Sequence, residues 1–145
     1  MTHPVDHLLS LARLAERYAE PALVEWLAEG LDQHLYRGVR LDKALGLAGG
    51  QGRRTARRRF LERERNRALR AAWTLCDGET DWDRSKELAR QIRRFEALVW
   101  PHWQVLADPP SDASHLRQHL HRAFQCGLVP SSDSHVHDLC ALSCE

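Results

Sequence analysis

Arginines are concentrated in one stretch of the chain, GGQGRRTARRRFLERERNRALR, which extends from Gly49 to Arg70. From Arg53 onward this stretch holds nine arginines and only two glutamates, a net charge of +7. Residues 1–52 carry five basic and seven acidic side chains, and residues 71–145 carry seven and eleven, so both flanks are acidic. The guanidinium group is a planar, permanently charged fork that suits phosphate and carboxylate. A positive cluster inside a protein of net charge +1 therefore indicates a local binding surface.

Helical geometry would place several of these side chains on one line. Four arginines recur at intervals of four, four and three residues, which on an α-helix forms a continuous stripe along one face. They are Arg59, Arg63, Arg67 and Arg70. Lys86, Arg90 and Arg93 repeat at similar intervals on the next expected helix. If the two helices pack as an antiparallel hairpin, the two stripes merge into one basic ridge.

Phosphate contact is the physical use of such a ridge, because each neutralised phosphate releases counterions. The contact would recognise the nucleic-acid backbone rather than the base sequence, and it leaves open whether the ligand is DNA or RNA. The leading hypothesis is a non-catalytic nucleic-acid-binding protein, for example a regulator or a nucleoprotein subunit. The expected contact residues are Arg53, Arg54, Arg57, Arg58, Arg59, Arg63, Arg67, Arg70, Lys86, Arg90 and Arg93.

The arginine-rich stretch allows two further interpretations. In the first, the ridge docks on an acidic protein partner, as in an adaptor or an inhibitor of the mobile-element type. In the second, it is the solvated polar face of a long helix, since arginine is a good helix former. Glu62 is then expected to pair with Arg58 and Arg65. Glu64 is expected to pair with Arg67, so that part of the positive charge is neutralised.

A glycine tract precedes the arginine-rich helix. Gly49, Gly50 and Gly52 can expose backbone N–H groups and form an anion-holding loop at the start of a helix. The same region has the order of a helix-turn-helix, but its turn is about twice the usual three or four residues. Neither the P-loop pattern nor GxGxxG occurs, so no nucleotide-binding fold is expected.

Histidines and cysteines near the C-terminus have partial zinc-ligand spacing. His115 and His119 lie four residues apart on one expected helix. His137, Cys140 and Cys144 share one face of another. Structural zinc needs four such ligands in a tetrahedron, but the paired-ligand spacing of zinc knuckles is missing. We therefore expect no metal and no cofactor, with zinc binding as the less favoured alternative.

Catalytic motifs are missing from the sequence. It has no HExxH, no GxSxG and no Cys–His arrangement with an oxyanion partner. The carboxylates of DGETDWD, from Asp77 to Asp83, do not follow the EF-hand pattern. They are expected to cap a helix, with Thr80 and Asp83 as a capping box. Cys126 and Cys140 are expected to be small core residues, and Cys76 is expected to end the apolar face of its helix. The protein is not expected to be an enzyme.

The tryptophans allow two interpretations. Trp26 and Trp73 lie beside apolar stripes and are expected in the core. Trp100 and Trp103 flank Pro101 in VWPHW, where they are expected to form a hydrophobic lid over a helix end. The alternative is an exposed aromatic edge that stacks unpaired bases or anchors a protein partner.

The elements that must position these residues are all helical. Apolar residues recur with the helical period throughout, and no stretch alternates long enough for a strand. Helices are expected over about 5–18, 21–37, 41–47, 55–76, 80–100, 114–126 and 132–142. The expected fold is a compact all-α bundle of about six or seven helices with a long central helical hairpin.

Length and composition agree with one domain, residues 1–145, with a possible minor boundary at the 107–113 linker. A chain of 145 residues with 43% hydrophobic residues is long enough to bury a core and is unlike a disordered chain. The first twenty residues have no uninterrupted apolar run long enough for a signal peptide, so none is expected, and no segment is expected to span a membrane. With four cysteines and no CxxC pair, the protein is expected to be cytoplasmic with reduced thiols.

Overall fold

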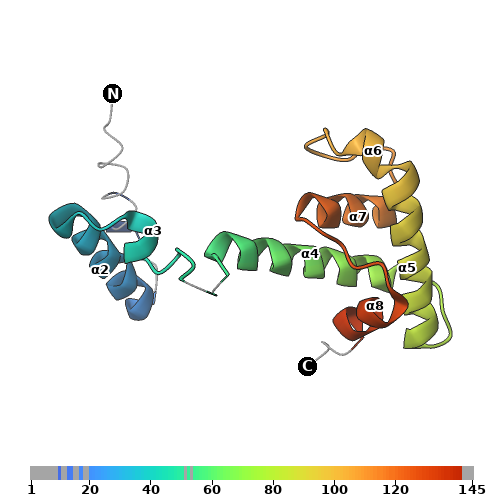
Figure 1. Cartoon of the computed structure of the whole chain (residues 1–145), viewed down its shortest axis with the longest axis horizontal. Helices are drawn as coiled ribbons and strands as arrows, with labels where there is room; N and C mark the ends of the chain where they lie inside the picture. The colour runs from blue at the N-terminus through green and yellow to red at the C-terminus, as the bar shows by residue number, and fades with distance from the viewer. Residues whose placement is uncertain are drawn as a thin grey trace. The chain divides into compact units, whose positions relative to one another are not determined.

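The computed structural model describes residues 10, 13–14, 17, 20–50, 52 and 54–141, and its regular elements are helices (Figure 1). They are α2 (Pro21–Arg37), α3 (Leu41–Ala44), α4 (Ala56–Thr74), α5 (Asp81–Leu98), α6 (Trp100–Trp103), α7 (His115–Gln125) and α8 (Asp133–Cys140). These seven helices, with no strand among the described residues, confirm the all-α fold expected from the sequence. The first expected helix, over residues 5–18, falls largely outside the described residues.

The chain divides into two compact units, residues 1–57 and residues 58–145. Helices α2 and α3 belong to the first unit, and α5 to α8 belong to the second. Helix α4 begins at Ala56, just before the boundary between the units. The single domain expected over residues 1–145 stays a prediction.

Helix α2 begins and ends at residues whose backbone preferences suit those places. Pro21 lies in the first turn, where a missing N–H leaves no intrahelical bond unmade. Gly38 adopts the left-handed conformation with φ 66°, and its N–H donates to the carbonyl of Gln33. Glycine reaches this conformation without a steric penalty, so it ends the helix. Both ends agree with those expected from the sequence.

Leucines recur at every fourth position of α2, from Leu23 to Leu35, but not all of them are buried. Leu31 is buried, whereas Leu23 is exposed. A side chain at Gly30 would collide with Leu45, which follows α3, so glycine allows the close approach of the two segments. Trp26 was expected in the core, but it is 46% exposed, and its Nε1 donates to the carbonyl of Leu45 at 3.2 Å. The prediction for Trp26 is wrong because the ring lies against the edge of α3 instead of filling a core.

The core of the second unit is built by α4, α5, α7 and α8. Its buried residues are Ala68, Leu69, Ala72, Trp73, Cys76, Leu88, Ala89, Ile92, Phe95, Leu120, Ala123, Phe124, Val136 and Cys140. Helix α5 is central, because it packs against α6, α7 and α8. Its residues Leu88, Ala89 and Ile92 have no exposed surface. The apolar positions that recur with the helical period are therefore those that the fold buries.

Helices α4 and α5 are the two long consecutive helices expected from the sequence. Figure 1 shows them running in crossed directions rather than side by side. The most extensive packing of α5 is with α8. The basic residues of α4 and α5 therefore do not merge through antiparallel packing, and they form two separate sets.

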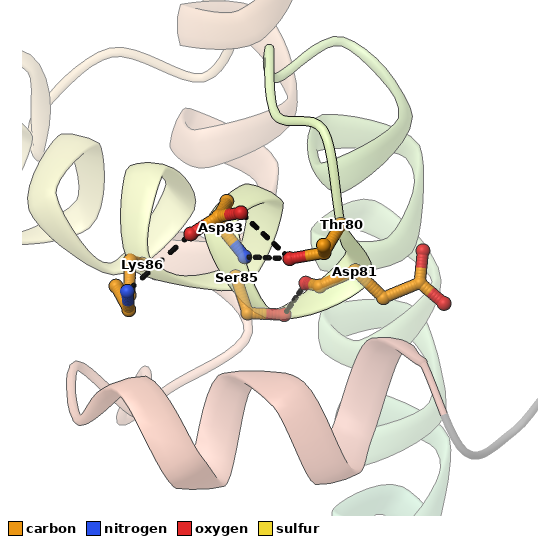
Figure 2. Close-up of polar contacts among 5 residues, drawn as sticks. All are labelled: Thr80, Asp81, Asp83, Ser85 and Lys86. Carbon is orange, nitrogen blue, oxygen red and sulfur yellow. Dashed lines mark hydrogen bonds and ion pairs between the residues drawn. The ribbon is translucent and has the colours of Figure 1, made fainter.

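The start of α5 has the capping arrangement expected from the sequence (Figure 2). The Thr80 hydroxyl accepts from the Asp83 N–H at 3.1 Å and donates to the Asp83 carboxylate at 2.7 Å. The Lys86 ammonium lies 3.4 Å from the other carboxylate oxygen. The hydrogen bonds from Thr80 and Lys86 lower the pKa of Asp83. This cap satisfies one of the N–H groups that a helix start leaves without an intrahelical partner.

Replacing Thr80 by alanine is expected to lower the free energy of unfolding by about 1 kcal/mol at neutral pH, because the cap is lost. The folded-state pKa of Asp83 is depressed, so the stabilisation from its carboxylate is present above the unfolded pKa of about 3.9. That stabilisation is lost as the pH falls through the folded value. The cost of Thr80→Ala should therefore shrink in acid. Urea unfolding at neutral and acidic pH measures both effects, and a cost independent of pH would contradict this role of the carboxylate.

A buried polar contact joins α4 to the start of α5. The Trp73 indole N–H donates to the Ser85 hydroxyl at 3.1 Å. Ser85 donates in turn to the carbonyl of Asp81 at 2.7 Å (Figure 2). The guanidinium of Arg84 lies 5.0 Å from the centre of the Trp73 ring. Trp73 is a core residue, as expected, and its polar atom is satisfied within the core.

Trp100 and Trp103 cover one end of this core. The Trp103 ring lies 5.8 Å from the Phe95 ring, and the Trp100 ring lies 5.3 Å from the Phe124 ring. The buried His121 contacts both tryptophan rings edge-on. Both tryptophans are partly buried against the core. The interpretation as a hydrophobic lid is confirmed.

Candidate nucleic-acid interface

Three arginines lie on the solvent-exposed side of α4, and we call Arg59, Arg63 and Arg67 the arginine line. All three are exposed. The α4 residues that enter the core are Ala68, Leu69, Ala72 and Trp73. The helical period places the line and these core residues on different faces, as expected. Arg70, the fourth expected member of the stripe, is partly buried.

The two glutamates of α4 bond to arginines that do not belong to the arginine line. Glu62 lies 3.5 Å from Arg58, as expected, but the expected Glu62–Arg65 pair is wrong, because the Arg65 guanidinium bonds to Asn66 and to the carbonyl of Leu128. Glu64 accepts from Arg122 of α7 at 2.6 Å and not from Arg67, so the expected Glu64–Arg67 pair is wrong. The Glu64 side chain is only 17% exposed. A carboxylate with so little solvent is best stabilised by a short charge-assisted hydrogen bond, which α7 supplies.

The arginine line consequently keeps its charge. Across the part of the chain that the structure describes, no carboxylate forms an ion pair with Arg59, Arg63 or Arg67. Helix α4 as a whole carries seven arginines and two glutamates, a net charge of +5. Its exposed side is therefore a positive surface that the fold itself does not neutralise.

Three other arginines hold the C-terminal segment in place. The bonds are Arg65 Nη1 to Leu128 O at 2.9 Å, Arg70 Nε to Leu139 O at 3.2 Å, and Arg93 Nη1 to Ser131 O at 2.6 Å. Each donor satisfies a backbone carbonyl in α8 or in the segment that joins α7 to α8. The spacing of these arginines does not predict this role, because the accepting carbonyls are 38 to 69 residues away in the chain.

Arg93→Ala is expected to lower the free energy of unfolding by about 1 kcal/mol, because the bonds to Ser131 and Asp133 are lost from a half-exposed site. Nucleic-acid binding should be unchanged by this substitution. Urea unfolding and a binding titration on the same preparation measure the two effects. Weakened binding with unchanged stability would assign Arg93 to the interface instead.

The other basic residues expected on α5 are paired with carboxylates of the same helix. Lys86 lies 3.4 Å from Asp83, and Arg90 is hydrogen-bonded to Glu87. The hydrogen bond from Arg90, together with one from Gln91, lowers the pKa of Glu87. Exposed pairs of this kind add little stability, but they neutralise the local charge. This side of α5 is therefore less positive than the sequence spacing suggests.

The remaining expected contact residues lie before α4 or at its start. Arg54 and Arg57, in the first unit, are exposed, and Arg53 lies outside the described residues. Gly50 is exposed, and Gly52 has a φ of 76°, a conformation that favours glycine. The anion-holding loop expected at this tract stays a prediction.

Two adjoining hollows lie between α4 and α7 and share Glu64, His119 and Arg122 in their walls. We call them together the α4–α7 groove. The smaller has a volume of about 280 Å³ and includes Arg67. The larger has a volume of about 500 Å³ and includes Phe60, which is 61% exposed. In the sequence, only Phe60, an aromatic residue among arginines, indicates this groove. The other wall is formed by α7, and the position of α7 depends on tertiary packing that the sequence of α4 does not reveal.

The histidines and cysteines form no metal site within the described residues, where no three suitable ligands lie close enough together. Cys144 is outside those residues. Cys76 and Cys140 are buried, as expected, and Cys126 is partly buried. Burial raises the pKa of the Cys76 thiol to about 11, so this thiol is protonated at neutral pH.

Neither the helices of the structure nor similarity to known proteins assigns a function to this chain. Of the helices that the structure describes, none is both long enough and apolar enough to cross a membrane. No protein-family model matches the chain, and no curated protein or solved structure shows significant similarity to it.

Proposed function

We propose that this protein binds the phosphate backbone of nucleic acids through the arginine line of α4 and does not catalyse a reaction. The proposal rests on the positive charge of this line, which no carboxylate among the described residues neutralises. Three exposed guanidinium groups share one side of a helix, and both glutamates of that helix are bonded to other arginines. Guanidinium forks form strong charge-assisted hydrogen bonds with phosphate oxygens. The proposal keeps the cytoplasmic location expected from the sequence.

The length of the arginine line is compatible with contacts to several consecutive phosphates of a nucleic-acid strand. Four residues of α-helix rise about 6 Å, so the line extends over about 12 Å. Each strand of a duplex carries one phosphate per about 3.4 Å of helix axis, so several phosphates lie within that length. Binding of this kind contacts no base edge and is therefore independent of base sequence.

The proposed interface contains fewer residues than the one expected from the sequence. Arg70 and Arg93 stabilise the C-terminal segment through backbone carbonyls. Lys86, Arg90 and Arg58 each have a carboxylate partner. A guanidinium committed to a partner in the fold must give up that bond before it can bind phosphate. The arginine line has no such ion pair to lose among the described residues, which is why we assign the contact to it.

A salt series of fluorescence anisotropy titrations, with labelled duplex DNA and single-stranded RNA, tests this proposal. Three neutralised phosphates predict a slope of log affinity against log salt of about −2.7 for the duplex and about −2.1 for the single strand. For the duplex this is about a 40-fold loss of affinity between 50 and 200 mM salt. If neither ligand binds at low salt, the proposal is wrong, and an acidic protein becomes the partner to seek.

A further inference from the structure

The α4–α7 groove contains an aromatic side chain that the fold leaves uncovered. Phe60 is 61% exposed, and it lines the larger hollow together with Leu61 and Pro109. Exposed apolar surface gathered around a hollow marks binding sites more often than isolated exposed residues do. The volume of this hollow, about 500 Å³, lies within the range of about 300–1,000 Å³ typical of ligand sites.

The groove lies directly beside the arginine line. Phe60, Arg63 and Arg67 follow one another at intervals of three and four residues, so their side chains share one side of α4. Arg67 lines the smaller hollow and Phe60 the larger, with Glu64 in the walls of both. A polyanion held on the arginine line therefore passes along the edge of the groove.

The groove itself is not suited to phosphate. Glu64 and Arg122 are hydrogen-bonded to each other across it, so this pair adds no net charge. Burial, together with the nearby His115 and Arg122, lowers the pKa of His119, and its ring is neutral at neutral pH. Asp108 adds a negative charge to the wall of the larger hollow. A flat, uncharged group with hydrogen-bonding edges fits these walls better than a phosphate does.

We infer that the α4–α7 groove receives an unpaired base of a single-stranded nucleic acid, which stacks on Phe60 while the arginine line holds the neighbouring phosphates. The inference rests on the proposed function and adds a ligand class to it. Aromatic side chains beside a positive surface are a general means of binding single strands without sequence preference. In a duplex the faces of the bases are covered by their neighbours, so a base cannot enter the groove. Gln118, His119 and Asp108 provide polar atoms for the edge of the base.

Paired titrations of a short oligouridylate and a short DNA duplex, with wild type and Phe60 variants, test this inference. Phe60→Ala is expected to weaken binding of the single strand about tenfold, because a base–aromatic stack is lost, and to leave duplex binding unchanged. Phe60→Tyr retains an aromatic face and should bind as wild type does. Phe60→Leu retains apolar bulk without that face and should be nearly as weak as Phe60→Ala.

Leu98→Ala is the matched control. Leu98 is 63% exposed on α5 and does not line the α4–α7 groove. Its replacement should change binding of neither ligand. Circular dichroism of each variant checks that the helical fold is retained, as expected for substitutions at exposed positions.

The outcomes distinguish a failure of base stacking from a failure of phosphate contact. If Phe60→Ala affects both ligands equally, or neither, the base-stacking inference is overturned while phosphate contact by the arginine line stands. If Phe60→Leu binds as tightly as wild type, apolar contact replaces stacking and the inference is likewise overturned. If wild type binds neither ligand at low salt, the proposed function fails, and this inference fails with it.

Discussion

Reversing the charge of the arginine line, with Arg59→Glu, Arg63→Glu and Arg67→Glu combined, is expected to weaken nucleic-acid binding at least about a hundredfold. Three contacts that release counterions become three that repel phosphate, and the local charge falls by six. The dependence of affinity on salt should disappear together with the affinity, because both arise from the same contacts. Anisotropy titrations of duplex and single strand across the same salt series measure both quantities.

The fold should tolerate this triple substitution. Arg59, Arg63 and Arg67 are exposed and form no ion pair among the described residues, so their replacement removes no salt bridge of the native state there. Glutamate is also a good helix former, so α4 should persist. The free energy of unfolding in urea is expected to change by no more than about 0.5 kcal/mol. A large loss of stability would show that the line supports the fold instead of a ligand.

Two control triples make the test specific. Changing the same three positions to lysine retains the charge, so most of the affinity and the salt slope should remain. Changing Lys86, Arg90 and Arg94 of α5 to glutamate alters the net charge by the same amount on another helix. This second triple should weaken binding far less. Equal losses from both glutamate triples would mean that overall charge, and not the arginine line, controls the affinity.

If the partner is an acidic protein instead, different binding results are expected. Wild type would then bind neither nucleic acid, and the glutamate triple would lose only its protein partner. The uncovered Phe60 would in that case be an anchor for the partner at the edge of a charged surface, a role in which aromatic residues are common. Pull-down with wild type and the triple variant, followed by salt titration of any captured protein, distinguishes this case.

Local chemistry explains which parts of the fold the sequence predicts. The cap formed by Thr80 and Asp83 involves neighbouring residues, and so does the left-handed end of α2 at Gly38. The helical period places the arginine line and the buried residues of α4 on different faces without knowledge of any other helix. These features depend on residues within one or two turns, so spacing alone is sufficient to predict them.

Tertiary packing explains what the sequence does not predict. Glu64 is as close in sequence to Arg67 as helix pairing requires, yet it bonds to Arg122, whose distance in space depends on how α7 packs. Arg93 has the spacing of a surface stripe, but it donates to a carbonyl 38 residues away. Trp26 has the spacing of a core residue, but it lies beside α3. In each case a partner distant in the sequence decides the role, and no local pattern contains that partner.

The largest loss of stability is expected from Phe95→Ala, which should lower the free energy of unfolding by about 3–5 kcal/mol. Phe95 is 2% exposed. Its ring contacts those of Trp103 and Phe124 at 5.8 and 5.4 Å, so one side chain joins α5, α6 and α7. Truncation removes the transfer free energy of the ring and leaves a cavity that two large neighbours cannot easily fill. Typical domains are stable by only about 5–15 kcal/mol, so this loss is a large fraction of the total.

Leu98→Ala provides the comparison on the same helix. Leu98 is 63% exposed, and its truncation should cost no more than about 0.5 kcal/mol. Urea unfolding measures both variants, and an unchanged dependence on urea would show that the same surface is exposed on unfolding in each. A loss below about 1 kcal/mol for Phe95→Ala would mean that α6 and α7 pack on the core without this ring. Because the arginine line faces away from the core, folded Phe95→Ala protein should still bind nucleic acid, so stability and binding can be lost independently.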